Sequence, residues 1–190
     1  MKNVSYNLDI NSPYSIFNNF ARAFPFSSSI YALFFGIIFQ NFELIFYCVG
    51  HIFNNFSNKI FKQLFFNLDI SFFGNVRRPF KNMIHMANNF YDPKYKGHFR
   101  GMPSGHAQTS GFFAIYFLCY LYNKIVKYKY LIVTLLILVT IYICYTRVNI
   151  FKVHTINQVI LGYVIGLYLG YLWFSFGSTI KNKYYSAKAN

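Results

Sequence analysis

The sequence predicts an all-α fold, an integral membrane helical bundle with about four or five spans. The composition is 55% hydrophobic and 23% aromatic, more apolar surface than a soluble domain of 190 residues needs to cover its core. Eighteen lysines and arginines against four acidic residues give a net charge of +14. Long apolar runs beside these charges favour a membrane protein that handles anionic groups over a nucleic-acid binder.

The first third of the chain is predicted as a surface segment followed by two helices. Residues 1–28 are expected to lie at the membrane surface, because Pro25 and other breakers interrupt any long helix there. The first span is expected over residues 30–49, where Glu43 has to face protein or be protonated. Residues 52–74 have one apolar and one polar face, which fits a spanning or an interfacial helix, and we favour a spanning one.

The remaining segments follow as a basic loop and three spans. In the loop over residues 75–103, His85 and His98 have no partner at metal-ligand spacing and are interpreted as surface histidines. The cysteines lie inside apolar runs without paired spacing, so neither a disulfide nor a metal site is predicted. The three spans are expected over residues 106–122, 130–145 and 154–176.

One short stretch, Pro103-Ser104-Gly105-His106, has the features of a phosphate site. A helix that starts there leaves backbone N–H groups unpaired at the positive end of its dipole, and such a terminus attracts phosphate. The Ser104 hydroxyl adds a donor, and His106 can give or take a proton one turn inside the helix. An ordinary capped helix start with an incidental histidine is the alternative.

Other ionisable residues also stand at helix ends. Arg78 follows one predicted helix, Arg147 closes another and His154 opens the last. If successive helices alternate in direction, these ends and His106 lie on one side of the membrane. One guanidinium group can donate two parallel hydrogen bonds to two oxygens of a phosphate. Basic residues are common at membrane interfaces, but that explanation does not account for histidines placed at helix starts.

The last predicted helix has a stripe at i+4 spacing, formed by His154, Gln158, Gly162, Gly166 and Gly170. Gln158 lies one turn after His154 and can hold one imidazole nitrogen by a hydrogen bond, leaving the other free. The glycines are expected to form a face along which a neighbouring helix packs closely.

In order, Arg78-Pro79, Pro103-Ser104-Gly105-His106 and Arg147 with His154 resemble the three phosphatase motifs of the type-2 phosphatidic acid phosphatase/haloperoxidase superfamily. The resemblance covers about residues 70–170, and the second and third motifs look most like those of dolichyl diphosphate phosphatases. The motifs are expected at helix ends on one membrane side.

Three positions depart from the superfamily pattern. Ser71 stands where a lysine normally precedes the first arginine, and Lys62 is too far away in register to replace it with confidence. Six residues rather than five separate Arg147 from the histidine, so this connection must bulge by one residue. Gln158 replaces an aspartate, and a neutral amide cannot stabilise imidazolium as a carboxylate would, which implies a slower nucleophile.

The resemblance implies a metal-independent, membrane-bound phosphatase that hydrolyses a lipid phosphate or diphosphate (polyprenyl or dolichyl diphosphate, or phosphatidate) through a phosphohistidine. His154 would be the nucleophile, and His106 would protonate the leaving oxygen and then activate water. No metal or cofactor is expected. A lipid phosphotransferase and a non-catalytic phospholipid-binding membrane protein remain alternatives. The expected phosphate ligands are Arg78, Ser104, Gly105 and Arg147, with Gln158 orienting His154.

The same reading divides the chain into a surface segment (1–28), a membrane phosphatase domain (29–177) and a basic tail (178–190). The expected partners are the lipid phosphate and the bilayer; nucleic acid is not expected, and a homodimer is left open. Lysines in the turn at 124–129 and in the tail lie opposite the active-site ends. By the positive-inside rule they face the cytosol, so we expect an integral membrane protein, with a lumenal active site if it resides in the endoplasmic reticulum.

Overall fold

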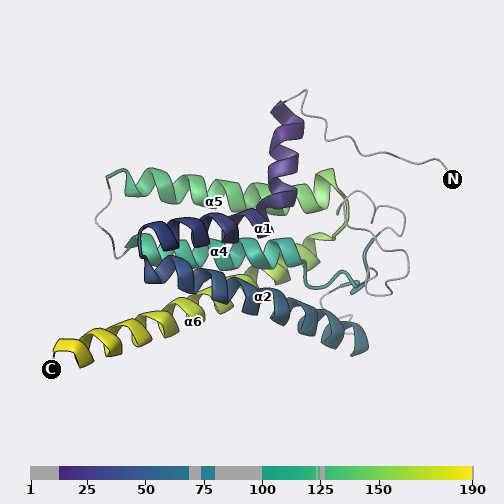
Figure 1. Cartoon of the computed structure of the whole chain (residues 1–190). Coiled ribbons are helices and arrows are strands. Elements are labelled where there is room, and N and C mark those ends of the chain that lie inside the picture. The colour runs from purple at the N-terminus through teal and green to yellow at the C-terminus, as the bar shows by residue number, and fades with distance from the viewer. Residues whose placement is uncertain (1–12, 69–73, 80–99, 123, 125–126, 190) are drawn as a thin grey trace.

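The computed structural model describes residues 13–68, 74–79, 100–122, 124 and 127–189, so His85 and His98 lie outside the described residues. Five α-helices and one π-helical turn make up its regular structure, and no strand occurs in these ranges. In Figure 1, α2, α4, α5 and most of α1 run side by side along one direction. The predicted all-helical bundle is confirmed. The elements are α1 (Pro13–Ile38), α2 (Phe42–Asn67), α4 (Gly105–Tyr122), α5 (Lys129–Tyr145), η4 (Thr146–Ile150) and α6 (Ile156–Ala189).

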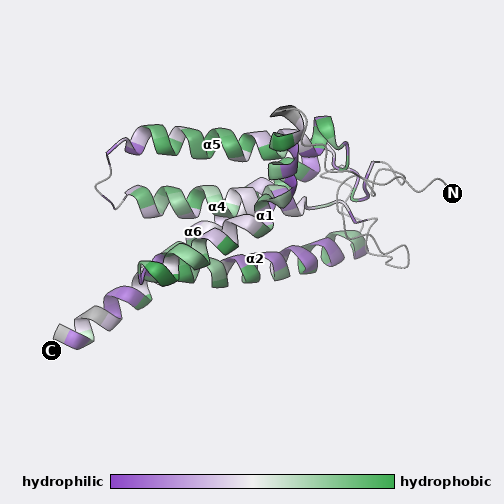
Figure 2. Ribbon diagram, turned by 45° about the horizontal axis from the view of Figure 1, so that its top comes forward, coloured by the Kyte–Doolittle hydropathy of each residue, from purple (hydrophilic) through white to green (hydrophobic). Residues whose placement is uncertain are grey.

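Within the described ranges, three helical segments are long and apolar enough to cross a membrane, namely Ser15–Ile38, Lys129–Ile150 and Ile156–Lys188. α5 is the most uniformly hydrophobic of the helices in Figure 2, whereas α2 carries polar residues towards its C-terminal end. Along α2 the usual distribution is inverted, because Ile52 and Phe56 are exposed while Asn54 and Asn58 are buried. Such a helix is stable when its apolar face meets lipid and its polar face meets other helices. The chain is a helical membrane bundle.

The predicted first span over residues 30–49 is wrong, because α1 ends at Ile38 and α2 begins at Phe42. Gln40 turns the chain with a φ of 47°, and the Asn41 side chain caps α2 by accepting a hydrogen bond from the Leu44 N–H at 3.1 Å. Glu43 therefore lies in the first turn of α2 rather than in the middle of a helix, and its carboxylate pairs with Lys181. The division into residues 1–28, 29–177 and 178–190 stays a prediction.

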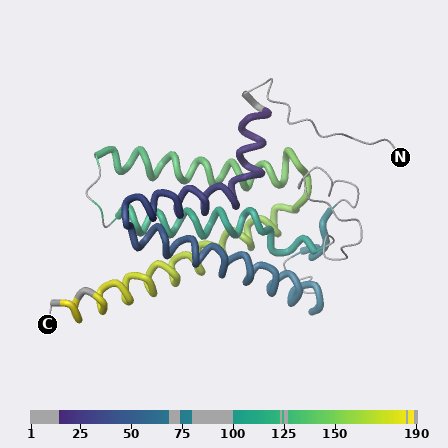
Figure 3. The backbone as a smooth tube through the Cα atoms, in the orientation of Figure 1, coloured from purple at the N-terminus to yellow at the C-terminus, as the bar shows by residue number. Residues whose placement is uncertain are grey.

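Pro25 bends α1 but does not end it, which corrects the expectation that this segment has no long helix. Proline has no N–H to donate to the carbonyl four residues earlier, that of Ala21, so the helix opens at this turn. Figures 1 and 3 show the resulting sharp bend between the first turns of α1 and the part that runs beside α4. The bend places the turn that contains Arg22 at one end of the bundle.

The glycine face predicted for the last helix is confirmed. A Cβ atom at Gly162 would lie 2.6 Å from the Ser104 carbonyl oxygen, and one at Gly166 would collide with the Gln108 carbonyl. α6 can therefore approach the backbone of α4 only because it lacks side chains along this stripe.

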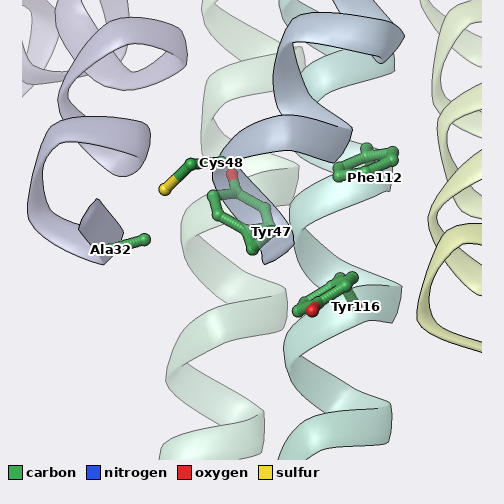
Figure 4. Packing of buried hydrophobic residues seen from close by; sticks show 5 residues of the cluster. All are labelled: Ala32, Tyr47, Cys48, Phe112 and Tyr116. Carbon is green, nitrogen blue, oxygen red and sulfur yellow. The ribbon is translucent and has the colours of Figure 1, made fainter. Parts of the chain in front are cut away.

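Aromatic packing fills the middle of the bundle. Tyr47 of α2 is fully buried between Ala32 of α1 and two rings of α4, Phe112 and Tyr116 (Figure 4). This cluster fixes three helices against one another, so that their ends are held in place.

Candidate active site

The predicted motif residues come together at one end of the bundle. The C-terminal end of α2, the start of α4, the π turn η4 and the start of α6 all lie at the side of Figure 1 opposite the C-terminus. His154 is 4% exposed, Arg147 1% and Ser104 not at all. These polar side chains are thus buried at neighbouring helix ends rather than distributed along the bundle.

One ring nitrogen of His154 is held by a hydrogen bond, and the other has no protein partner among the residues that the structure describes. Its Nδ1 lies 3.0 Å from Gln158 Oε1. The Gln158 amide can be oriented in one way only, because its Nε2 is 2.6 Å from the carbonyl oxygen of Asn75 and 2.7 Å from that of Arg77. Both carbonyls accept, so Nε2 must donate to them, and Oε1 must face the histidine. Nδ1 therefore carries the hydrogen and Nε2 keeps its lone pair.

Gln158 also joins the three motifs to one another. Its Oε1 accepts a second hydrogen bond from the Thr155 N–H at 3.3 Å, and its backbone carbonyl accepts one from the Ser104 N–H at 2.9 Å. A Cβ at Gly101 would lie 2.6 Å from the amide, so only glycine leaves room for it. A carboxylate at position 158 could not donate to the two carbonyls, which gives a physical reason for glutamine here.

His106 is oriented by a backbone group of the bent helix α1. Its Nε2 lies 3.2 Å from the Arg22 carbonyl oxygen, which can only accept, so Nε2 carries a hydrogen. The other nitrogen, Nδ1, is the atom left to exchange a proton with a ligand. The bend at Pro25 therefore helps to place the Arg22 carbonyl where it can accept the hydrogen bond from His106.

Arg147 lies in the π turn η4, where the sequence has one residue more than the superfamily pattern. A π turn takes up one extra residue within a helix. The Arg147 carbonyl accepts hydrogen bonds from the N–H groups of Val153 and His154 at 3.1 and 3.3 Å, which ties the arginine to the histidine. The predicted one-residue bulge between Arg147 and His154 is thus present.

The Arg147 guanidinium has spare hydrogen-bonding capacity. Its Nε and Nη1, together with Nε of Arg78, are buried and have no hydrogen-bond partner within the described ranges. The guanidinium carbon lies 4.9 Å from the Phe151 ring centroid, and that of Arg22 lies 4.5 Å from the same ring. Stacking on Phe151 holds the Arg147 guanidinium in position while leaving its N–H donors available to an anion.

The electrostatics of the site favour a neutral His154. Burial holds the pKa of His154 well below its ordinary value of 6.5, and the positive charges of Arg78, Lys62 and Arg147 lower it further. The hydrogen bond to Gln158 opposes these effects. A neutral imidazole with a free lone pair is the form that acts as a nucleophile.

Ser104 and Gly105 occupy the start of α4. The Ser104 hydroxyl is fully buried with no hydrogen-bond partner among the residues that the structure describes, whereas its N–H is used by Gln158. A Cβ at Gly105 would lie 3.1 Å from Oδ1 of Asn58, whose Nδ2 donates to Gln108 at 2.8 Å. This buried contact between α2 and α4 fixes the helix start beside the arginines.

Two further basic residues lie near the site: Arg22 was not predicted from the sequence, and Lys62 was judged too far away in register to be assigned to it. Lys62 of α2 acts electrostatically on both His106 and His154, and its Nζ donates to the Arg100 carbonyl at 3.3 Å. The positive charge of Arg22 of α1 repels that of Arg147, and both guanidinium groups lie against the Phe151 ring. The polar face of residues 52–74 was a signal for Lys62, because a lysine on the buried side of a membrane helix needs a function. No sequence signal pointed to Arg22.

Comparison with known proteins gives one family. The family model described as "PAP2 superfamily" matches residues 43–181. "Dolichyldiphosphatase 1" of Dictyostelium discoideum is 34% identical over 79 residues, which cover 39% of this chain and 34% of that protein. The matched stretch therefore spans about a third of the relative's length. No solved structure matches. The resemblance drawn from the motifs is confirmed at the level of the superfamily.

Proposed function

The chain belongs to the PAP2 superfamily, and from this membership and the geometry of the site we propose that it is a metal-independent phosphatase for a lipid phosphate or diphosphate. The observation that carries the proposal is the tautomer of His154, whose Nε2 lone pair is left free in the field of Arg78, Arg147 and Lys62. A nucleophile facing unbalanced positive charge is suited to attack a phosphate, whose negative charge would otherwise repel it.

In the proposed first step, Nε2 of His154 attacks phosphorus and a P–N bond forms while the bond from phosphorus to the leaving oxygen breaks. The leaving oxygen takes a proton from Nδ1 of His106, whose Nε2–H stays bound to the Arg22 carbonyl. The negative charge of the bound phosphate favours a protonated His106 at this stage. The product is a phosphohistidine and a lipid alcohol or lipid monophosphate.

In the second step, water attacks the phosphohistidine and His106 takes the proton from the water, which restores both histidines and releases phosphate. Arg78, Arg147 and Lys62 balance the charge that spreads over the equatorial oxygens in each transition state. The Ser104 hydroxyl and the Gly105 N–H at the start of α4 are the proposed neutral donors. Because the cations supply the neutralisation, the proposed chemistry requires no metal.

We also propose that the site faces the side of the membrane opposite the cytosol. Lys124 and Lys129 flank the connection between α4 and α5, and Lys181 lies on the distal half of α6, all away from the site. The positive-inside rule places these ends in the cytosol. In the endoplasmic reticulum the site would then be lumenal, where the name of the matched relative is consistent with a dolichyl diphosphate substrate.

The test is phosphate release by the purified protein in detergent with EDTA present, from dolichyl diphosphate, phosphatidate and glucose 6-phosphate. We expect release from a lipid substrate and its loss in His154→Ala and His106→Ala. If the wild-type protein binds these lipids but releases no phosphate, hydrolysis is rejected in favour of lipid binding. Release to an added alcohol rather than to water would instead identify a phosphotransferase.

A further inference from the structure

An apolar groove of about 260 Å³ runs between α1 and α4. Its floor is buried, since Phe24 and Ala32 are 4% and 5% exposed. Its rim is open to the surroundings of the bundle, since Tyr31 and Phe35 are 61% and 44% exposed. The aromatic residues that line it are Phe20, Phe24, Tyr31 and Phe35 of α1 with Phe113 and Phe117 of α4.

One end of this groove lies beside His106. Phe113 and Phe117 follow His106 at seven and eleven residues, so all three share one face of α4. The helix rise places their backbone positions about 10 and 16 Å along the axis from that of the histidine. From the other side, Phe20 and Phe24 flank Arg22, whose carbonyl accepts the hydrogen bond from His106. The rings of Phe24 and Phe113 meet edge to face at 4.9 Å and close the groove floor.

The polar groups along the groove have partners within the protein. The Ser28 hydroxyl lies 3.2 Å from that of Tyr47, and the Ser27 hydroxyl donates to the Phe24 carbonyl at 3.4 Å. The groove therefore offers a ligand apolar surface and no charge. A hydrocarbon chain is the chemistry that fits it.

His106 is the residue proposed to protonate the leaving oxygen, and in a lipid phosphate that oxygen carries the rest of the lipid. We propose that the groove between α1 and α4 holds the first part of the hydrocarbon tail of the substrate, an inference that rests on the proposed function. The open rim lets the tail enter sideways from the bilayer while the phosphate stays at the cationic end.

A second groove does not meet this requirement. It is lined by Leu118, Cys119, Tyr171 and Phe174 and lies between the distal parts of α4 and α6. Leu118 is twelve residues beyond His106, about 18 Å along the helix, so this groove is not continuous with the leaving-group position. It gives the experiment an alternative outcome.

The experiment uses the full chain in nanodiscs with two substrates, butyl phosphate and hexadecyl phosphate. Ser27→Trp places a large ring in the groove, and Ile30→Trp adds the same ring on the exposed side of the same helix, outside the groove lining. We expect Ser27→Trp to lower kcat/KM for hexadecyl phosphate by about tenfold or more, the scale on which a pocket rejects a small change of shape. The rate with butyl phosphate should stay unchanged and thereby shows that the variant is folded.

An equal loss for both substrates, or an equal loss in Ile30→Trp, would overturn the groove assignment. If the wild-type protein releases phosphate from neither substrate, nor from dolichyl diphosphate or phosphatidate, the proposed function fails, and the groove is then tested by binding alone. For that purpose a hexadecyl phosphate with a diazirine in its chain is photo-crosslinked to the protein. Labelling within residues 20–35 or at Phe113 supports the groove, whereas labelling at Tyr171 or Phe174 of α6 overturns it.

Discussion

The two ends of the bundle differ in whether a positive charge has a counter-ion. At the end away from the site, Lys181 of α6 pairs with Glu43, the one acidic side chain in the part of the chain that the structure describes. At the site end, the positive charges of Arg78, Arg147 and Lys62 lower the pKa of His154, and no described carboxylate lies among them. Arg147 is 1% exposed, whereas the Lys181 side chain is 31% exposed.

This difference separates charge that stabilises the fold from charge that is kept for a ligand. A partly exposed ion pair contributes little to stability and costs little to form. A buried cation without a counter-ion costs several kcal/mol, and several together repel one another. Such a cluster lowers the stability of the free protein, and the repulsion is relieved only when an anion binds. We therefore expect the site end to be less stable than an uncharged packing would be, because the charges are needed for activity.

The largest expected effect comes from removing a buried cation at the site. Arg147→Met should lower kcat for lipid phosphate hydrolysis by about 10³-fold, the upper range for loss of one transition-state donor. The same variant should raise the unfolding temperature in phosphate-free buffer, because an apolar side chain of similar length replaces an unpaired buried charge. Phosphate release and thermal unfolding in detergent measure the two effects.

Arg77→Met is the control, because Arg77 precedes Arg78 in the sequence and its side chain is exposed. It should change neither quantity. A stability loss in Arg147→Met would show that the guanidinium is part of the structural frame, and the contrast between the two ends would then be withdrawn.

Lys62 gives a smaller effect of the same kind. Lys62→Met should lower kcat/KM by about 10²-fold, because one of the charges that faces the phosphate is lost. Lys59→Met on the exposed side of the same helix should leave kcat/KM unchanged. Equal behaviour of the two variants would place Lys62 outside the site. A steady-state assay with one lipid substrate is sufficient.

Gln158→Glu tests whether the amide or the superfamily's carboxylate suits this site better. The substitution turns the donor to the Asn75 and Arg77 carbonyls into an acceptor, at a cost of about 1–3 kcal/mol for the groups left unsatisfied. We expect kcat/KM to fall about tenfold, as 1.4 kcal/mol corresponds to a factor of ten. A rise in kcat instead would mean that stabilising the imidazolium outweighs the lost hydrogen bonds.

The smallest effect is expected at the opposite end. Glu43→Gln breaks the ion pair with Lys181 and should lower the free energy of unfolding by about 0.2–1 kcal/mol. Phosphate release should not change, because this end is remote from the histidines. A loss of activity comparable to that of Lys62→Met would show that the two ends are coupled.

The sequence was sufficient to predict the helical membrane bundle, the superfamily and the meeting of the motif residues at one end. These follow from local features, namely apolar runs, the i+4 stripe from His154 to Gly170 and the residue counts between motifs. The extra residue before His154 predicted a bulge, and a π turn over Thr146–Ile150 is how the chain forms it.

What could not be predicted depends on tertiary contacts or on weak turn signals. The turn at Gln40 is hidden inside a continuous apolar run, although Asn41 followed by Glu43 is a recognisable helix start. Lys62 and Arg22 reach the site from helices whose positions only the packing determines. The donation from Gln158 to two carbonyls likewise needs the loop of the first motif in place.

The most direct test of the proposed phosphohistidine mechanism is to locate the covalent phosphate. Wild-type protein would be mixed with a phosphorus-labelled lipid substrate, quenched in base within one turnover, digested and sequenced by mass spectrometry, with phosphorus NMR to identify the substituted ring nitrogen. The proposed mechanism predicts phosphate on Nε2 of His154, with Nδ1 protected by Gln158. Phosphate on Nδ1 or on another residue, or steady turnover with no phosphoenzyme, would contradict it.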